Sequence, residues 1–241
     1  MAGLGLMNRR RAIASSPIAG ITMEDYLIGK YNFIGRSNDD PDRGIVQDLS
    51  GRGNPMTLSF NNWGKGDAYT TTGYYDDCLC SFPGSNYATI PLTEPMSDNF
   101  TIIIERAFYS GGLANYSALL GSNSSLSSSK STIFLEYIDA GYEGGGYSCV
   151  LGAKVHFGRT NGNGIAWLTP FGYNGYMNDD FVPTETSYAT KLIIGKLRDS
   201  VFYYQRFKIK SIHIFNRVFG AQEIEEYIKK NIDANYTLTE E

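Results

Sequence analysis

The chain has 241 residues, with 25 Asp and Glu against 21 Lys and Arg and a formal net charge of −4. Only 19% of the residues are charged, whereas 27 are Gly, 18 are Tyr and 13 are Phe, a composition that excludes coiled coils and helical bundles. The 42% of hydrophobic residues argues against disorder, and the acidic balance argues against nucleic-acid binding. No segment reaches the roughly 18 apolar residues of a membrane span.

Residues 1–22 are predicted to form an N-terminal arm and attachment segment. Three arginines at 9–11 precede a mildly apolar run at 12–21, and Pro17 interrupts this run together with two serines. A secretory signal needs about 7–15 strongly apolar residues at this place, so we expect no signal peptide. The segment Thr22–Asp25 then fits a capping box, which predicts a short helical turn.

From Tyr31 onward, short apolar runs alternate with turn residues, a pattern typical of an antiparallel β-protein. Six segments rich in β-branched and aromatic residues are predicted strands. They are Tyr87–Pro91, Phe100–Phe108, Thr132–Ile138, Ser148–Phe157, Tyr188–Gly195 and Lys208–Phe215.

One helix is predicted, at Ala221–Lys230. It carries Ile224, Tyr227 and Ile228 on one stripe, with glutamates early and lysines late, as the helix dipole favours. Many short strands with one terminal helix indicate an all-β sandwich or jelly roll, in one domain over residues 23–235 with a tail at 236–241.

Cysteine and histidine carry no recognisable reactive motif. An odd number of cysteines excludes a complete disulfide framework, so Cys78, Cys80 and Cys149 are predicted to be buried free thiols. The alternative is a bridge from Cys78 or Cys80 to Cys149. His156 and His213 lie in predicted strands without a nucleophile motif, which favours hydrogen-bonded or solvent-facing strand residues.

Four segments resemble a known family when they are taken in order. They are the turn Asp48–Asn54, the strand Phe82–Pro91, the strand opening Asn99–Ile102, and the closing strand and helix Ile212–Ile224. Together they resemble laminin-G-like, or concanavalin A-like, lectin and glucanase domains. The resemblance implies an antiparallel jelly-roll β-sandwich with one short C-terminal helix and the N-terminal arm outside it. The arginine-rich start also resembles proteins encoded by gut Bacteroidetes and their phages.

The glucanase branch of that family needs two carboxylates on one face of a strand. The nearest candidates here, Glu136 and Asp139, have an odd spacing that directs them to opposite faces of a strand. Retaining hydrolysis needs the two carboxyl groups about 5–5.5 Å apart. The sequence therefore predicts a chain that is not an enzyme.

Calcium is the one cofactor that the resemblance implies, held near the rim of the sandwich by Asp and Asn side chains and backbone carbonyls. Two acidic clusters offer hard oxygen ligands of the kind that Ca²⁺ prefers. The predicted calcium ligands are Asp76, Asp77, Asp179 and Asp180. The alternative is that both clusters are solvated turns.

Aromatic residues in polar, Gly- and Asn-rich segments are the predicted ligand-binding residues. Their flat apolar faces and polar edges suit sugar rings or a protein surface. They are Trp63, Tyr74, Tyr75, Trp167, Tyr173 and Tyr176. The alternative is that they pack loops onto the sandwich.

These observations favour a recognition or adhesion module for a glycan or a protein on a surface. We expect the chain to lie on a virion or an extracellular surface. On a virion, it would be a phage component docked through residues 1–20. If it lies on neither surface, we expect it in the cytoplasm. The alternatives are a structural or decoration protein of a larger assembly and a carbohydrate-active enzyme on the same sandwich. We expect no nucleic-acid partner and no membrane span.

Overall fold

The computed structural model describes eleven stretches of the chain. They are residues 21–64, 72–81, 86–96, 99–107, 117–122, 135–138, 156–160, 163–168, 189–198, 201–204 and 207–237. Of the predicted arm at residues 1–22, residues 1–20 lie outside the described residues.

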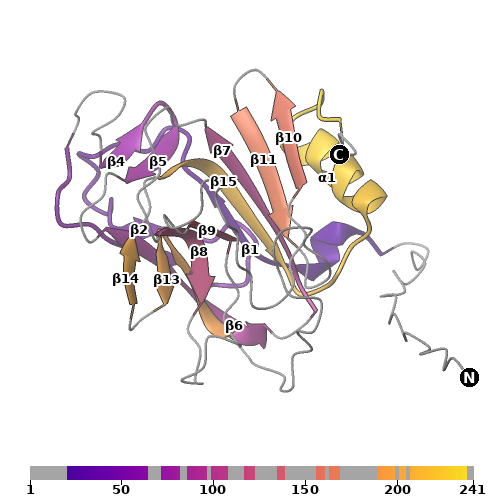
Figure 1. Cartoon of the computed structure of the whole chain (residues 1–241), viewed down its shortest axis with the longest axis horizontal. Coiled ribbons are helices and arrows are strands. Elements are labelled where there is room, and N and C mark those ends of the chain that lie inside the picture. Colours follow the sequence, from indigo (N-terminus) through magenta and orange to yellow (C-terminus); the bar gives the residue numbers. More distant parts are fainter. Residues whose placement is uncertain are drawn as a thin grey trace, which may run out of the picture.

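The described residues form strands in two sheets, one 3₁₀-helix and one α-helix (Figure 1). The helices are η1 (Met23–Tyr26) and α1 (Ala221–Asn231). The strands are β1 (Leu27–Asn32), β2 (Ile45–Val46), β3 (Met56–Ser59), β4 (Gly73–Tyr75), β5 (Cys78–Ser81), β6 (Tyr87–Met96), β7 (Thr101–Ala107), β8 (Ser117–Ser122), β9 (Leu135–Ile138), β10 (His156–Thr160), β11 (Asn163–Leu168), β12 (Ala189–Ile194), β13 (Lys196–Arg198), β14 (Val201–Tyr204) and β15 (Phe207–Phe215).

Sheet A has seven strands, in the order β10-β11-β7-β15-β5-β4, with β1 also paired to β15. Sheet B has eight strands, in the order β13-β14-β8-β12-β6-β3-β2, with β9 also paired to β8. The ladders are antiparallel except that between β14 and β8. The predicted all-β class with one short C-terminal helix is confirmed, and the jelly-roll connectivity stays a prediction.

The two sheets share one hydrophobic core, the main core. Ile104 and Ile214 enter it from sheet A, and Ile90 and Leu192 enter it from sheet B; all four are fully buried. Successive side chains of a strand point to opposite faces of the sheet. The residues on either side of Ile104 in β7 and of Ile214 in β15 therefore lie on the outer face of sheet A. The side chains on that outer face form two sets, one polar and one apolar.

A second core, the outer core, lies under helix α1 on the outer face of sheet A. Ile103 and Phe215 from the sheet pack there with Ile224, Tyr227 and Ile228, the predicted stripe of the helix. These residues bury the apolar face of α1, which stabilises the helix more than its intrinsic propensity does. The predicted helix is thus confirmed.

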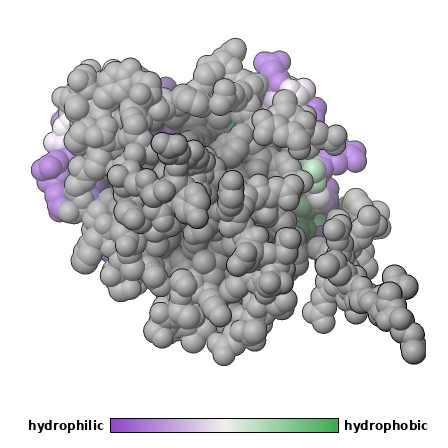
Figure 2. Space-filling view, viewed as in Figure 1, coloured by the Kyte–Doolittle hydropathy of each residue, from purple (hydrophilic) through white to green (hydrophobic). Residues whose placement is uncertain are grey.

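The 3₁₀-helix η1 packs beside α1. Its capping box is present, because the Thr22 backbone N–H donates to the Asp25 carboxylate at 2.7 Å. Lys230 of α1 forms an ion pair with Glu24 of η1 at 2.8 Å. In the space-filling view, hydrophilic residues are visible around a small hydrophobic area at the side of the molecule that carries α1 (Figure 2). Among the described residues, no helix is long and apolar enough to cross a membrane.

The turn Asp48–Asn54 covers the outer edge of β1. The Asp48 carboxylate accepts hydrogen bonds from the backbone N–H groups of Lys30, Ser50 and Asn54 at 2.9 to 3.1 Å. Gly51 and Gly53 have φ of 80° and 76°, a conformation that glycine adopts without steric cost. The Asp and Gly residues of this motif therefore have a structural role, which is to satisfy a strand edge.

Candidate functional site

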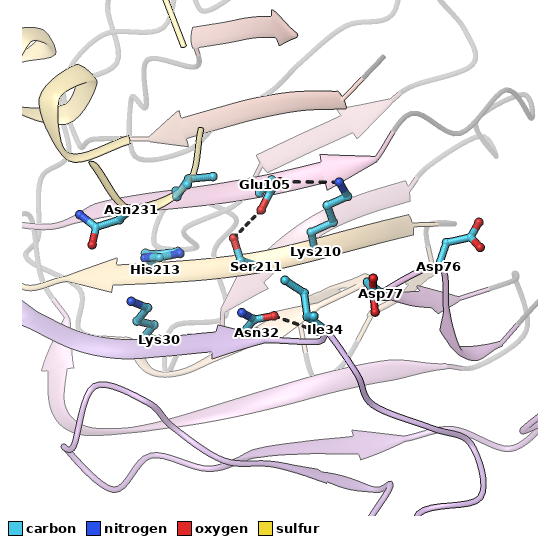
Figure 3. A pocket seen from close by; sticks show the side chains of 11 residues that line it. Lys30, Asn32, Ile34, Asp76, Asp77, Glu105, Lys210, Ser211, His213 and Asn231 are labelled. Atoms are coloured by element: carbon cyan, nitrogen blue, oxygen red, sulfur yellow. Dashed lines mark hydrogen bonds and ion pairs between the residues drawn. The ribbon is translucent and has the colours of Figure 1, made fainter. Parts of the chain in front are cut away.

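A cavity of about 280 Å³ opens on the outer face of sheet A, and we call it the outer groove. It lies between the turn of the β4–β5 hairpin and the C-terminal end of α1, over strands β1, β15 and β7 (Figure 3). Most of the side chains that line it are polar or charged. The outer groove is the candidate functional site because such a cavity collects hydrogen-bonding groups from elements far apart in sequence.

Strand register brings the polar side chains of the groove into one row. Asn32 of β1 lies opposite Ser211 of β15, and Ser211 lies opposite Glu105 of β7. Directly opposed residues on one face have Cβ atoms about 4.5–5.5 Å apart, so their side chains interact. The Ser211 hydroxyl donates a hydrogen bond to Glu105 Oε2 at 3.0 Å.

A register shift in β15 adds a second charged residue to the same face. The pairing of β15 with β7 shifts between Ile209 and Ser211, and the consecutive residues Lys210 and Ser211 both line the groove. A bulge redirects a side chain in this way, and bulges are frequent beside functional sites. The Lys210 ammonium consequently lies 3.9 Å from Glu105 Oε1 (Figure 3).

Glu105 is the most buried acid of the groove, with 20% of its side chain exposed. Burial raises its pKa above the ordinary value, and the hydrogen bond from Ser211 and the charge of Lys210 oppose this rise. A carboxyl group with a raised pKa can hold or release a proton closer to neutral pH than an exposed glutamate can. Glu105 is thus the group of the groove best suited to acid–base chemistry.

His213 forms the boundary between the groove and the outer core. It is 2% exposed, and its Nδ1 lies 2.7 Å from the Tyr227 hydroxyl of α1. Burial lowers the pKa of His213 to about 3, and the nearby charge of Lys30 contributes in the same direction. The prediction of a hydrogen-bonded strand histidine is confirmed for His213.

Asp76 and Asp77, two of the predicted calcium ligands, line the far end of the groove. They form the two-residue turn between β4 and β5, with φ of 50° and 57°, as a tight hairpin requires. Asp76 Oδ2 lies 2.9 Å from Lys208 Nζ, and Asp77 Oδ1 accepts a hydrogen bond from the Gly35 backbone at 3.0 Å. These contacts hold the hairpin against β15 and the loop after β1.

The described residues do not bring a complete calcium site together. Ca²⁺ takes about 6–8 oxygen ligands. No group of three or more His, Cys, Asp or Glu side chains within the described stretches could hold a metal ion. Asp179 and Asp180 lie outside the described residues. The calcium ligand set therefore stays a prediction.

Three of the predicted binding aromatics gather at the β4 end of the molecule, away from the lining of the groove. The Trp63 ring lies 5.9 Å from the Tyr74 ring, and Arg43 lies over Trp63 at 5.1 Å. Tyr74 is 5% exposed and donates a hydrogen bond to the Arg43 backbone carbonyl. Tyr75 is half-buried and lies under the Lys208 ammonium at 5.2 Å. These contacts pack the loops onto the sandwich.

The other predicted aromatics are not part of this cluster. Trp167 of β11 is 4% exposed and packs in the outer core. Tyr173 and Tyr176 lie outside the described residues.

The two cysteines of β5 are free and buried, as predicted. Burial raises the pKa of Cys78 to about 11 and that of Cys80 to about 12, so both thiols stay protonated near neutral pH. Cys149 lies outside the described residues.

No sequence motif points to Lys30, Glu105, Lys210 or Ser211. One signal was present: polar residues interrupt the otherwise apolar predicted strands Phe100–Phe108 and Lys208–Phe215. Isolated polar residues of this kind on otherwise apolar strands indicate a face that is partly open. Only the register shows that they meet.

No protein-family model matches the chain, and no curated protein matches it. Laminin-G-like membership is therefore not shown, although the two sheets agree broadly with the predicted sandwich.

Solved structures that are similar to this chain include sialidases of Trypanosoma rangeli. The sialidase in complex with sialic acid matches with a TM-score of 0.47 and 13% identity, over 87% of this chain and 34% of that chain. A second structure of this sialidase gives a TM-score of 0.48 and 14% identity, over 87% and 33%. The covalent-intermediate complex with 2,3-difluorosialic acid gives 0.45 and 12%, over 87% and 34%. This chain thus spans about a third of the length of those proteins.

The prediction that the chain is not an enzyme is contradicted by these neighbours, because sialidases are enzymes. We withdraw that prediction. Identities of 12 to 14% over a third of each sialidase carry no substrate and no catalytic residue over to this chain.

Proposed function

We propose that the chain recognises carbohydrate and that the outer groove is the site that binds it. The observation that carries the proposal is the row of Asn32, Ser211 and Glu105, which three strands hold side by side in an open cavity. The row offers an amide, a hydroxyl and a carboxylate. Sugar hydroxyls both donate and accept hydrogen bonds, so a mixed row of this kind is complementary to them.

The groove residues are held in place before a ligand arrives. Asn32 Oδ1 accepts the Ile34 backbone N–H at 2.8 Å, and Ser211 donates to Glu105 at 3.0 Å. Fixed side chains lose less conformational entropy when a ligand binds, and this favours affinity for a small polar ligand. No described residue bonds the Asn32 amide nitrogen, so this group can donate to a ligand.

An apolar contact is also available. Ile34 lines the groove and is 64% exposed, and Ile232 lines the groove at the end of α1. The C–H faces of a sugar ring can cover these side chains while its hydroxyls bond the polar row. Burying such a surface contributes about 25 cal/mol per Å².

A glycan array tests the proposal with the full chain, its Ile34→Ala variant and its Leu49→Ala variant. Leu49 is a matched control, because it is an exposed apolar residue, at 58%, that does not line the groove. We expect saturable binding to a defined class of glycan, weaker by about threefold to tenfold in Ile34→Ala and unchanged in Leu49→Ala, as the loss of about 1 kcal/mol of apolar contact requires.

Two additions to the array sharpen it. Repeating it with a chelator tests the calcium prediction. Recovering the bound glycans for mass spectrometry shows whether the groove, with the raised pKa of Glu105, also cleaves its ligand. Absence of glycan binding, or equal weakening in both variants, would contradict the proposal.

A further inference from the structure

Lys30 differs from Lys210, the other lysine that lines the groove, and from Lys208, which pairs with a residue of its lining. Lys208 lies 2.9 Å from the Asp76 carboxylate, and Lys210 lies 3.9 Å from that of Glu105. The Lys30 ammonium has no hydrogen bond or ion pair with any described residue, although its backbone N–H bonds Asp48. It therefore brings an uncompensated positive charge to the lining of the groove.

The neighbours of Lys30 are neutral or are hydrogen-bond donors. His213 lies directly opposite Lys30 in the pairing of β1 with β15, and it is buried and uncharged near neutral pH. Asn32, two residues further along the same face of β1, has an amide nitrogen that no described residue bonds (Figure 3). An ammonium and an amide donor in a partly desolvated cavity form a site complementary to an anion.

The carboxylates that line the groove each contact a partner other than Lys30. Glu105 is bonded to Ser211 and paired with Lys210, and Asp76 is paired with Lys208. Asp77 bonds the Gly35 backbone at the hairpin end. In Figure 3, Lys30 and the two hairpin aspartates lie at opposite ends of the row, with Ser211 and Glu105 between them. Lys30, which has no ion pair with any described residue, thus lies at the α1 end of the groove, and the two hairpin aspartates lie at its other end; Asp233, just beyond α1, acts on Glu105 by raising its pKa.

We propose that the Lys30 end of the outer groove binds the anionic group, a carboxylate or a sulfate, of an acidic oligosaccharide. The proposal rests on the proposed function and names the class of sugar that this site selects. The anion bonds Lys30 Nζ and the Asn32 amide, and the sugar hydroxyls extend along the row toward Asp77. The neutral His213 forms an uncharged wall behind the anion.

Matched acidic and neutral glycans test this inference. The probes are oligogalacturonate and its methyl ester, sialyllactose and its methyl ester, and sulfated lactose and lactose, so that the carboxylate and sulfate arms are separate. The full chain is compared with Lys30→Gln and with Lys229→Gln. Lys229 is a matched control, because it is an exposed lysine of α1 whose removal changes the net charge equally.

We expect the native chain to bind the acidic member of at least one pair about tenfold more tightly than its neutral counterpart, as a charge-assisted hydrogen bond provides. Lys30→Gln should bring this ratio close to one without loss of binding to the neutral member, and Lys229→Gln should leave it unchanged. Raising the salt from about 0.1 M to about 1 M, which shortens the Debye length from about 10 Å to about 3 Å, should weaken only the acidic member.

The two proposals fail in different ways. Glycan binding with no preference for the acidic member, or with a preference that survives in Lys30→Gln, overturns this inference and leaves carbohydrate recognition standing. No binding to any glycan overturns both.

Discussion

The two halves of the outer face of sheet A are built from the same strands and have opposite characters. Under α1, Ile103 and Phe215 form a closed apolar core with the helix. Further along the strands, two residues after Ile103 in β7 and four before Phe215 in β15, Glu105 and Ser211 line an open polar groove. Helix α1 ends at Asn231, directly at this boundary. The outer-face side chains of β7 and β15 thus change from apolar to polar where the helix ends. This change separates the part of the face that stabilises the fold from the part that is available to a ligand.

His213 belongs to both halves. It lines the groove, and its Nδ1 is held by Tyr227 of the helix. The comparison therefore predicts that substitutions on the covered side change stability strongly and that substitutions on the open side change binding more than stability.

The largest effect is expected from Phe215→Ala, in the covered half. Phe215 is fully buried and contacts the rings of Phe219 and Tyr227 edge to face, at 5.7 and 5.0 Å between centroids. Removing a buried phenylalanine side chain costs about 3–5 kcal/mol. Urea denaturation of the native and variant chains measures this loss. A loss below about 1 kcal/mol would show that α1 does not close a core on sheet A.

A pH titration of stability tests the boundary residue. The pKa of His213 is lowered to about 3 in the folded chain and is near 6.5 when the chain unfolds. Below pH 6.5 the unfolded chain therefore binds a proton that the folded chain excludes. Stability that is fully present above pH 6.5 is lost as the pH falls toward 3, by about 3 kcal/mol between pH 7 and pH 4.

The raised pKa of Glu105 acts in the opposite direction, because the folded chain holds that proton more tightly than the unfolded chain does. The contribution of His213 is therefore measured as the difference in pH dependence between the native chain and His213→Gln. Parallel curves for the two chains would show that His213 is not held neutral in the fold.

A smaller effect is expected from Ser211→Ala in the open half. This variant removes the hydrogen bond to Glu105, which should cost about 1.5 kcal/mol, as a hydrogen bond to a charged group does. It should also raise the pKa of Glu105 further, because that hydrogen bond lowers it in the native chain. Denaturation and a carbon-13 NMR titration of the Glu105 carboxyl measure the two effects. An unchanged pKa of Glu105 would mean that Ser211 and Glu105 are not hydrogen-bonded in solution.

The smallest effect is expected from Lys230→Gln. The pair between Lys230 and Glu24 links α1 to η1, but 68% of the Lys230 side chain is exposed to solvent. Exposed ion pairs contribute about 0.2–1 kcal/mol, so the stability should change by less than about 1 kcal/mol. A larger loss of stability against denaturant would show that this ion pair contributes more to the attachment of α1 than the outer core does.

Local pattern was sufficient to predict α1 and several of the strands. The i, i+3, i+4 spacing of Ile224, Tyr227 and Ile228 predicted α1, and its N-terminal glutamates and C-terminal lysines agreed with the dipole. Their content of β-branched and aromatic residues predicted the strands that became β6, β7, β12 and β15. Each of these signals lies within one short segment, so no knowledge of chain pairing was needed.

The groove could not be predicted in the same way. Its row joins residues 32, 105 and 211, which only strand register and a shift in β15 bring together. Composition favoured aromatic residues as the binding site, but a tryptophan such as Trp63 serves equally well for packing a loop and for stacking on a sugar. Whether such a residue is covered depends on contacts such as that with Arg43, which the sequence does not reveal.

The most direct test of carbohydrate recognition in the groove is a two-dimensional ¹H–¹⁵N NMR titration of the full chain with a glycan that binds on the array. We predict that the amide signals of Lys30, Asn32, Glu105 and Ser211 shift together and saturate at one dissociation constant. Saturable shifts confined to Trp63, Tyr74 and their neighbours, with the groove signals unchanged, would place the binding site on the aromatic cluster and would contradict this account.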